Sequence, residues 1–421
     1  MSNAFDLDFN VLRYAPPHWE RRPLWTLVRR RDITGRPEAE LLSVYRDHGV
    51  VPRKSREDNF NKPSEDLTAY RYVRPGDLVL NKMKTWQGSL GVSRHEGIVS
   101  PAYFVCEMSP DVDAGYAHHL LRSEPYIHLY RTASKGIRPN QWDLPFDEFR
   151  KLPMLLPPRD EQRRIADFLD HETAKLTRIE FDSLRLTGLL EERQSALAAH
   201  CFTFARPDDA HSLPLRRVVQ RWIDYRGATP SKTESGVPLV TAKNIRDGRI
   251  DLDASREYIA TDAYTDWMRR GLLKMKDVLL TTEAPLGQVA MVNDTTIALA
   301  QRVIVLRADQ VTCSPEWLYW YLRSPQGQAE LELRATGSTA LGIKADRLRG
   351  VPIPLPSPRE AVRRLSRLSE SVAEVETLQR QLVKQRALVA ERRRALITAA
   401  VTGQFDVATA SGRNVTEGVT A

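Results

Sequence analysis

Apolar residues recur at a seven-residue spacing in two long stretches of the chain. The first stretch carries Ile165, Leu169, Leu176, Ile179, Leu186, Leu190 and Leu197, and the second carries Leu368, Val375, Leu378, Leu382, Val389 and Leu396. Within each stretch these residues fit positions a and d of one heptad register, which is typical of coiled-coil helices. We expect Leu169, Leu176, Ile179, Leu190 and Leu197 to pack against Leu368, Val375, Leu378, Val389 and Leu396 in an antiparallel helix pair.

Helix-breaking residues are nearly absent from both stretches. Residues 159–200 contain only Gly188 as a glycine, and no proline follows Pro358 in the second stretch. Both helices are therefore expected to run without interruption. A helix of about 42 residues is roughly 63 Å long, so the pair is predicted to act as a stiff spacer.

The two stretches belong to an internal repeat with a shift of 199 residues. The segment KLPMLLPPRDE (residues 151–161) aligns with GVPIPLPSPRE (residues 350–360). The same shift places Glu192, Arg193, Ala196 and Leu197 on Glu391, Arg392, Ala395 and Leu396. Agreement at both ends of a segment with one unchanged shift indicates a duplicated unit.

A domain-sized region with a different sequence pattern precedes each helix. Short apolar runs such as Asp77–Leu80, Asp277–Leu280 and Val303–Leu306 alternate with glycine- and proline-rich turns, which predicts short strands mixed with a few helices. The expected fold is α+β, with two mixed α/β domains, a pair of long antiparallel coiled-coil helices and a pseudo-twofold repeat. Its predicted parts are a first domain at 1–155, a helix at 156–202, a second domain at 203–356, a second helix at 357–402, and a partly disordered tail at 403–421.

Composition narrows the class of partner. The chain of 421 residues has a net charge of +8, which favours polyanions such as nucleic acid. Asp6 and Asp8 lie where a secretory signal would be apolar, and no stretch reaches the ~18 apolar residues of a membrane span. We therefore expect a cytoplasmic protein with no membrane partner. Cys106, Cys201 and Cys313 are isolated in the sequence, which favours buried thiols over disulfides or zinc ligands.

Several catalytic and cofactor motifs are missing from the sequence. There is no Gly-x-x-x-x-Gly-Lys-Ser/Thr loop, no Gly-x-Gly-x-x-Gly turn and no Asn-Pro-Pro-aromatic motif, so we expect no catalytic residue and no cofactor on this chain. The neighbouring His118 and His119 would point apart, which disfavours a shared metal. Asp77 with Lys82 and Lys84, or Asp277 with Glu283, could form a nuclease site, but an acid followed by a lysine after a strand is common.

Residues suited to DNA contact cluster in both domains. Lysine and arginine can contact phosphates, asparagine and glutamine can pair with adenine, and short polar side chains among glycines can approach a duplex. The candidates in the first domain are Lys54, Lys82, Lys84, Trp86, Gln87, Lys135, Arg138, Asn140 and Gln141. The candidates in the second domain are Arg226, Thr229, Ser231, Lys232, Lys243, Asn244, Arg246, Thr282, Gln288, Ser338 and Lys344. The alternative is an ordinary basic surface with ordinary turns, and with Trp86 and Trp142 in the core.

The motifs also resemble a known family. LLSVYRDHGVVPR (41–53), RPGDLVLNKMKTWQGSLGV (74–92), GIVSPAYFV (97–105), RGATPSK (226–232), GVPLVTAKNIRDGRID (236–251), LLPPRDEQRRIADFLD (155–170) and RRRALITAAVTGQFDV (392–407) resemble segments of the specificity subunits of type I restriction-modification systems. The second helix departs from the family pattern at Ala361, where the first helix has Gln162.

This resemblance implies a non-catalytic subunit that reads double-stranded DNA. Two target-recognition domains would lie at opposite ends of the helix pair, and each would read one half of a split site. The helices would set the gap and dock two modification subunits, which carry S-adenosylmethionine and methylate adenine. Two restriction subunits would use ATP and Mg²⁺.

Two other hypotheses remain open at this point. The chain could be a self-sufficient restriction enzyme with an unrecognised catalytic centre, which activity of the purified chain on DNA would reveal. It could also be a coiled-coil scaffold that binds protein, which absent or salt-insensitive DNA binding would favour.

Overall fold

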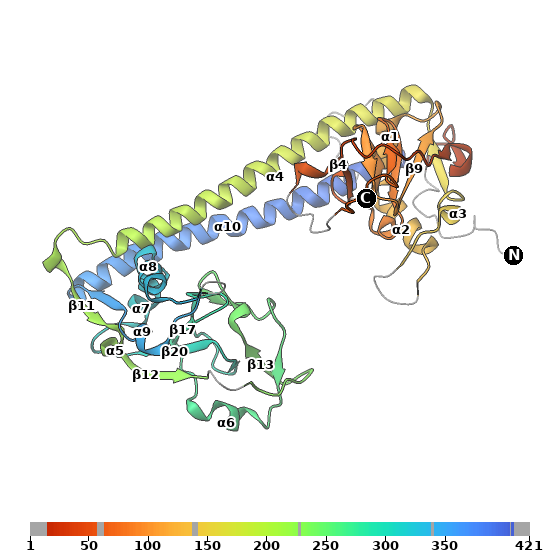
Figure 1. The fold of residues 1–421 in the computed structure, drawn as a ribbon. Coiled ribbons are helices and arrows are strands. Elements are labelled where there is room, and N and C mark those ends of the chain that lie inside the picture. The colour runs from red at the N-terminus through yellow and green to blue at the C-terminus, as the bar shows by residue number, and fades with distance from the viewer. Residues whose placement is uncertain are drawn as a thin grey trace. The chain divides into compact units, whose positions relative to one another are not determined.

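The computed structural model describes residues 15–56, 63–136, 142–225, 229–337, 341–404 and 406–407. The chain divides into two compact units. The first unit comprises Met1–Ser183 with Val383–Ala421, and the second comprises Leu184–Leu382. Each unit contains one mixed α/β domain and part of each of two long helices, α4 (Arg159–Cys201) and α10 (Pro358–Val401) (Figure 1).

The first unit is built on an antiparallel four-stranded sheet with the order β2-β9-β6-β7. Its strands are β2 (Val28–Arg30), β6 (Leu78–Asn81), β7 (Leu90–Val92) and β9 (Tyr103–Met108). Three strand pairs accompany the sheet: β1 (Glu20–Pro23) with β10 (Pro153–Leu156), β3 (Leu42–Tyr45) with β4 (Gly49–Pro52), and β5 (Arg71–Val73) with β8 (Gly97–Val99). The helices of this domain are α1 (Ala114–Leu121), α2 (Glu124–Ala133) and α3 (Phe146–Phe149).

The second unit repeats this plan with different lengths. Its four-stranded sheet has the order β12-β20-β17-β18 and consists of β12 (Val219–Asp224), β17 (Val278–Thr281), β18 (Val289–Met291) and β20 (Val303–Ala308). The smaller sheets are β11 (His211–Pro214) with β21 (Pro352–Leu355), β14 (Ile245–Arg246) with β15 (Arg249–Ile250), and β13 (Val237–Val240) between β16 (Tyr258–Ile259) and β19 (Ala298–Leu299). The helices are α5 (Leu215–Val218), α6 (Tyr264–Trp267), α7 (Pro315–Arg323), α8 (Pro325–Arg334) and α9 (Ala345–Leu348).

The two domains share a buried aspartate, but its arginine partner comes from a different position in each domain. Asp77 and Asp277 are almost fully buried ahead of β6 and β17, and each accepts a hydrogen bond from a backbone N–H three residues earlier, at Arg74 and Lys274. Burial raises the pKa of Asp77. Asp77 pairs with Arg31, whereas Asp277 pairs with Arg307 on β20 at 2.7 Å. The repeat therefore preserves a buried, arginine-paired carboxylate, but the arginine differs in position: Arg31 directly follows β2, and Arg307 lies on β20.

The two long helices occur where the heptad pattern predicts them. Helix α4 runs over Arg159–Cys201 and α10 over Pro358–Val401. In each unit they lie side by side (Figure 1). Leu169, Leu176 and Leu190 of α4, and Leu368, Val375, Val389 and Leu396 of α10, are buried. Leu197 is half-buried beside Leu190, Val375 and Leu382.

Two of the ten predicted seam positions are shifted by one residue. Ile179 and Leu378 are 39% and 45% exposed, so these two side chains do not form the expected apolar contacts. The more covered positions are the following ones, Glu180 and Gln379. The covered positions thus follow Leu176 and Val375 by four residues and not by the three that the heptad pattern predicts, which leaves Ile179 and Leu378 exposed.

Each domain packs its core onto both helices. The core of the first unit includes Leu169 near the start of α4 and Leu396, Ala400 and Val401 at the end of α10. The core of the second unit includes Cys201 at the end of α4 and Leu368 and Val372 of α10. These positions are related by the 199-residue shift, since Leu169 corresponds to Leu368 and Ala400 to Cys201. The helices therefore belong to the domain cores.

Candidate nucleic-acid interface

Two candidate segments come together beside the first sheet. The connection from β6 to β7 carries Lys82, Lys84 and Gln87, and the loop after α2 begins at Lys135. The backbone N–H of Leu144 donates to the carbonyl of Lys82 (3.2 Å), and the Lys82 ammonium lies 3.1 Å from the Asp143 carboxylate. These contacts dock the base of the loop on the strand connection.

The second unit places its equivalent segments in the same way. The backbone N–H of Ile343 donates to the carbonyl of Thr282 (3.0 Å), and a β-bridge joins Glu283 to Gly342. The loops after α2 and α8 are also closed in the same way, since a β-bridge joins the two ends of each loop. The bridge pairs Lys135 with Asp143 in the first unit and Thr336 with Gly342 in the second. Each domain thus builds one composite surface from segments that are about 50 to 60 residues apart in sequence.

The lysines of these surfaces are exposed, and the acids that pair with two of them, Asp143 and Glu148, are half-buried. Lys82, Lys84, Lys135 and Lys344 have exposed side chains. Lys135 pairs with Glu148 at 3.3 Å, and a side-chain hydrogen bond from Lys135 lowers the pKa of Glu148. Surface pairs of this kind contribute little to stability, so a phosphate group could take the place of the carboxylate at small cost.

Three predicted contact residues are instead internal. Trp86 is 8% exposed, donates from its indole N–H to the carbonyl of Met83 (3.0 Å), and lies 5.1 Å from the ring of Trp142. Thr282 is 1% exposed and donates to the carbonyl of Arg302 (3.3 Å). These side chains shape the loops and present no free face to a ligand.

Asn244 is the third internal residue, and its amide is saturated. Its Oδ1 accepts from the backbone N–H and the hydroxyl of Thr241, both at 2.9 Å, and its Nδ2 donates to the carbonyls of Asp251 (2.9 Å) and Ser255 (2.8 Å). An amide has two donors and one oxygen with two lone pairs. All of them are used, so Asn244 holds the β14–β15 hairpin and has no group left to read a base.

The other described candidates lie at the surface. Exposed side chains include Lys54, Thr229, Ser231, Lys232, Lys243 and Arg246, while Gln87 and Gln288 are half-buried. Lys232 pairs with Glu257 at 2.7 Å, and Thr229 donates to Gln301 at 3.1 Å. Five further candidates, Arg138, Asn140, Gln141, Arg226 and Ser338, lie outside the described residues.

The structure adds a basic edge that the sequence reasoning missed. Exposed Arg150 and Lys151 follow α3, and exposed Arg347 and Arg349 lie in and after α9. The edge adjoins the composite surface, because Glu148 of α3 contacts both Lys135 and Lys151. The repeat could have revealed it, since the 199-residue shift places Arg150 on Arg349.

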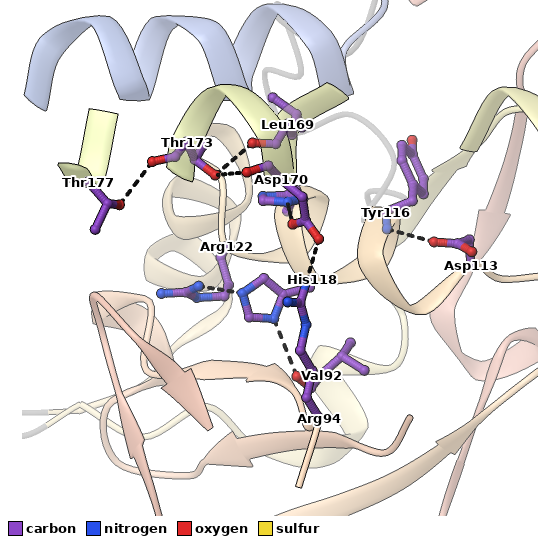
Figure 2. Close-up of polar contacts among 11 residues, drawn as sticks. Val92, Arg94, Asp113, Tyr116, His118, Arg122, Leu169, Asp170, Thr173 and Thr177 are labelled. Carbon is purple, nitrogen blue, oxygen red and sulfur yellow. Dashed lines mark hydrogen bonds and ion pairs between the residues drawn. The ribbon is translucent and has the colours of Figure 1, made fainter. Parts of the chain in front are cut away.

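The adjacent histidines of α1 make separate contacts (Figure 2). Arg122 donates from Nη1 to His118 Nε2 (2.6 Å), and since arginine can only donate, the neutral His118 ring is left to donate from Nδ1 to the Val92 carbonyl (3.4 Å). His119 contacts the Asp170 carboxylate of α4 at 2.9 Å. Hydrogen bonds from His119 and Arg94 lower the pKa of Asp170 to about 2. The two rings therefore serve different contacts, and among the described residues no group of three His, Cys, Asp or Glu side chains could hold a metal.

The cysteine thiols are poorly suited to chemistry. Cys106, Cys201 and Cys313 are buried, and burial raises their pKa values to about 12, 11 and 12. A thiol needs its thiolate form to act as a nucleophile. Within the part of the chain that the structure describes, no helix is both long and apolar enough to cross a bilayer.

A duplicated mixed α/β domain built onto a pair of long helices is also the fold of known proteins. The chain resembles two solved structures over nearly its whole length. One is a chain from work on complex assembly and conformational transition of the type I R-M system, with a TM-score of 0.69 at 18% identity over 93% of this chain and 99% of that one. The other is the HsdS subunit from Thermoanaerobacter tengcongensis, with a TM-score of 0.51 at 19% identity over 93% of this chain and 98% of that one.

A curated protein is similar in sequence. It is the type I restriction enzyme EcoBI specificity subunit of Escherichia coli, which is 22% identical over 275 residues. The matched region covers 59% of this chain and 58% of that protein's length. No family model matches the chain. The resemblance that the motifs indicate is thus found independently in sequence and in fold.

Proposed function

We propose that this chain is the non-catalytic DNA-recognition subunit of a type I restriction-modification complex. The observation that carries the proposal is the duplication of one composite surface made of two docked segments, which bears exposed Lys82, Lys84 and Lys135 in the first domain and exposed Lys344 in the second. Two similar surfaces with different side chains suit two readers of different half-sites. The similarity to specificity subunits supports the same assignment.

In this proposal the surface cations contact phosphates, and the half-buried amides read bases. Lys82, Lys84 and Lys135 serve the first half-site, and Lys243, Arg246 and Lys344 serve the second. Gln87 and Gln288 are the candidates for base contact, because glutamine can pair with adenine through two hydrogen bonds. The basic edge at Arg150 and Arg349 extends the phosphate contacts.

The partners are also part of the proposal. Two modification subunits would supply S-adenosylmethionine and adenine methylation, and restriction subunits would supply ATP-driven, Mg²⁺-dependent cleavage. The helix pair would dock the modification subunits and fix the gap between half-sites. A cytoplasmic location stays a prediction.

The first experiment expresses the chain with its modification subunits and maps methylated adenines by long-read sequencing. We expect a split motif with a fixed gap. Exchange of the first domain for that of a relative should change only the first half of the motif. A continuous motif, or a change in both halves, would contradict the assignment.

A second experiment measures DNA affinity of the assembled complex against salt concentration. Replacement of Lys84 by alanine should lower the slope of log K against log salt by about 0.9, the value for one lost phosphate contact. K175A is the matched control, because Lys175 is an exposed lysine of α4 paired with Glu172. Equal slopes for K84A and the unmodified complex would remove Lys84 from the interface.

A third experiment removes two heptads from each helix. A shorter spacer should shorten the gap in the methylated motif, because the helix pair would fix the separation of the readers. An unchanged gap would mean that the helices do not act as the ruler.

A further inference from the structure

Each unit holds a β-hairpin against a helix through the same two positions. In the first unit the β3–β4 hairpin turns at Arg46–His48 and lies beside α1. Arg122 donates from Nη1 to His118 Nε2 at 2.6 Å (Figure 2). It also donates from Nη2 to the carbonyl of Arg46 at 2.6 Å. The guanidinium thus bridges a side chain of α1 and the backbone of the hairpin turn.

The second unit uses the same two positions, but there the ring and not the arginine donates to the hairpin backbone. Tyr319 of α7 donates from its hydroxyl to the carbonyl of Gly248 (2.9 Å), in the turn of the β14–β15 hairpin. Arg323 donates to the same hydroxyl. Tyr319 and Arg323 stand 201 residues after His118 and Arg122. A ring followed four residues later by an arginine therefore fastens the hairpin in both units.

Each hairpin has a glycine in its turn or directly after it, at the point where the hairpin contacts the His118 or Tyr319 ring. Gly49 has a φ of +69° and Gly248 a φ of +82°, in the region that L side chains rarely adopt. A Cβ on Gly49 would lie 2.8 Å from His118 Cε1, and a Cβ on Gly248 would collide with Arg323 and Tyr319. The close approach is thus built into both hairpins.

The hairpins border the composite surfaces. The β3–β4 hairpin packs against β7, and Ser89 at the end of the β6–β7 connection donates to the carbonyl of Val44 (3.0 Å). The Arg46 side chain is 67% exposed at the hairpin turn. The β14–β15 hairpin packs against β18 and carries exposed Arg246 and Arg249.

We propose that the β3–β4 hairpin is a second DNA-contact element of the first domain, with Arg46 on a phosphate, and that His118 and Arg122 are positioning residues for it. Tyr319 and Arg323 have the same role for the β14–β15 hairpin. A fixed hairpin enters the complex without a further loss of conformational freedom, which favours both affinity and discrimination. This inference rests on the proposed DNA-recognition function.

The contact is tested with the assembled complex and its own methylated motif as duplex. R46A should lower the slope of log K against log salt by about 0.9, whereas R178A, at an exposed helix arginine paired with Asp182, should leave it unchanged. An unchanged slope for R46A would exclude the hairpin from the interface. If the unmodified complex does not bind the motif at all, the proposed function itself fails.

The positioning role is tested with duplexes altered in one half-site at a time. H118A and R122K should reduce discrimination at the first half-site by about fivefold or more, and they should leave the second half-site unchanged. R323K should do the reverse. H118Y, which copies Tyr319, should restore discrimination at the first half-site.

The second half-site is an internal control for folding and assembly in every first-domain variant. Thermal unfolding of H118A and H118Y gives a further control. If His118 had a merely structural role, the loss of discrimination at the first half-site would be proportional to the loss of stability in both variants. Equal loss at both half-sites, or full discrimination in H118A, would overturn the positioning role.

Discussion

The Arg393 guanidinium of α10 lies 2.9 Å from the Glu180 carboxylate of α4 and 3.0 Å from the Thr177 hydroxyl. Both charged side chains are about 30% exposed. The pair lies beside the turn of α4 on which Ile179 is exposed. A charge pair at this depth adds little net stability but penalises any register that leaves one charge unpaired.

Removing one partner of this pair should cost more than removing both. We expect R393L to lower the free energy of unfolding by about 1 to 2 kcal/mol, and E180L/R393L to recover at least the original value. Chemical denaturation measures both, with R178A as a surface control expected within ~0.5 kcal/mol. A double variant as unstable as R393L would show that the pair itself is strongly stabilising.

Gln162 ties the start of α4 to the loop before α1. Its Oε1 accepts from the Asp113 N–H (2.8 Å), and its Nε2 donates to the carbonyls of Asp111 (3.1 Å) and Pro157 (2.9 Å). The side chain is 1% exposed, so Q162A strands buried polar groups and should cost about 2 to 3 kcal/mol. Q381A, at an exposed glutamine of α10, is the control for denaturation measurements. Equal stability of the two variants would contradict this role.

Asn244 and its neighbour Lys243 should respond in opposite ways. N244A removes four hydrogen bonds to the segments that flank the β14–β15 hairpin and should lower the free energy of unfolding by about 2 kcal/mol. K243A should leave stability within ~0.5 kcal/mol and lower the salt slope of DNA binding by about 0.9. The prediction fails if N244A is as stable as the unmodified chain.

His118 should make stability depend on pH. Burial, with the nearby charges of Arg122, His119 and Arg94, lowers the pKa of His118 well below its ordinary 6.5. The unfolded chain therefore takes up a proton near pH 6.5 that the folded chain refuses, and stability falls as pH drops below 6.5, by up to ~1.4 kcal/mol per pH unit. Denaturation at pH 7.5 and at pH 5.5 measures how much stability is lost on acidification. The part of this loss that is due to His118 should be present in the unmodified chain and absent in H118Y. Parallel curves would contradict the prediction.

The sequence predicts the large features well because they rest on periodicity. The helices, the 199-residue repeat and strands such as Leu78–Asn81 all follow from spacing, and spacing survives in the fold. The buried Leu169 and Leu396 belong to this class.

Finer features depend on contacts that spacing does not encode. Ile179 is apolar and falls on the heptad, yet Glu180 takes the covered position because Arg393 satisfies its charge. Asn244 and Lys243 look equally suited to DNA, and only the distances to Thr241, Asp251 and Ser255 show that Asn244 is already occupied. Trp86 likewise became a core residue through Trp142, which lies 56 residues further along the chain.

The core of the first unit joins Leu24 and Leu169 to Leu396, Ala400 and Val401, whereas the core of the second unit uses only residues between Cys201 and Val372. During synthesis the second domain therefore has its full set of core residues before the first one does. The first domain therefore keeps part of its apolar surface uncovered until the end of α10 has been synthesised and has packed onto it.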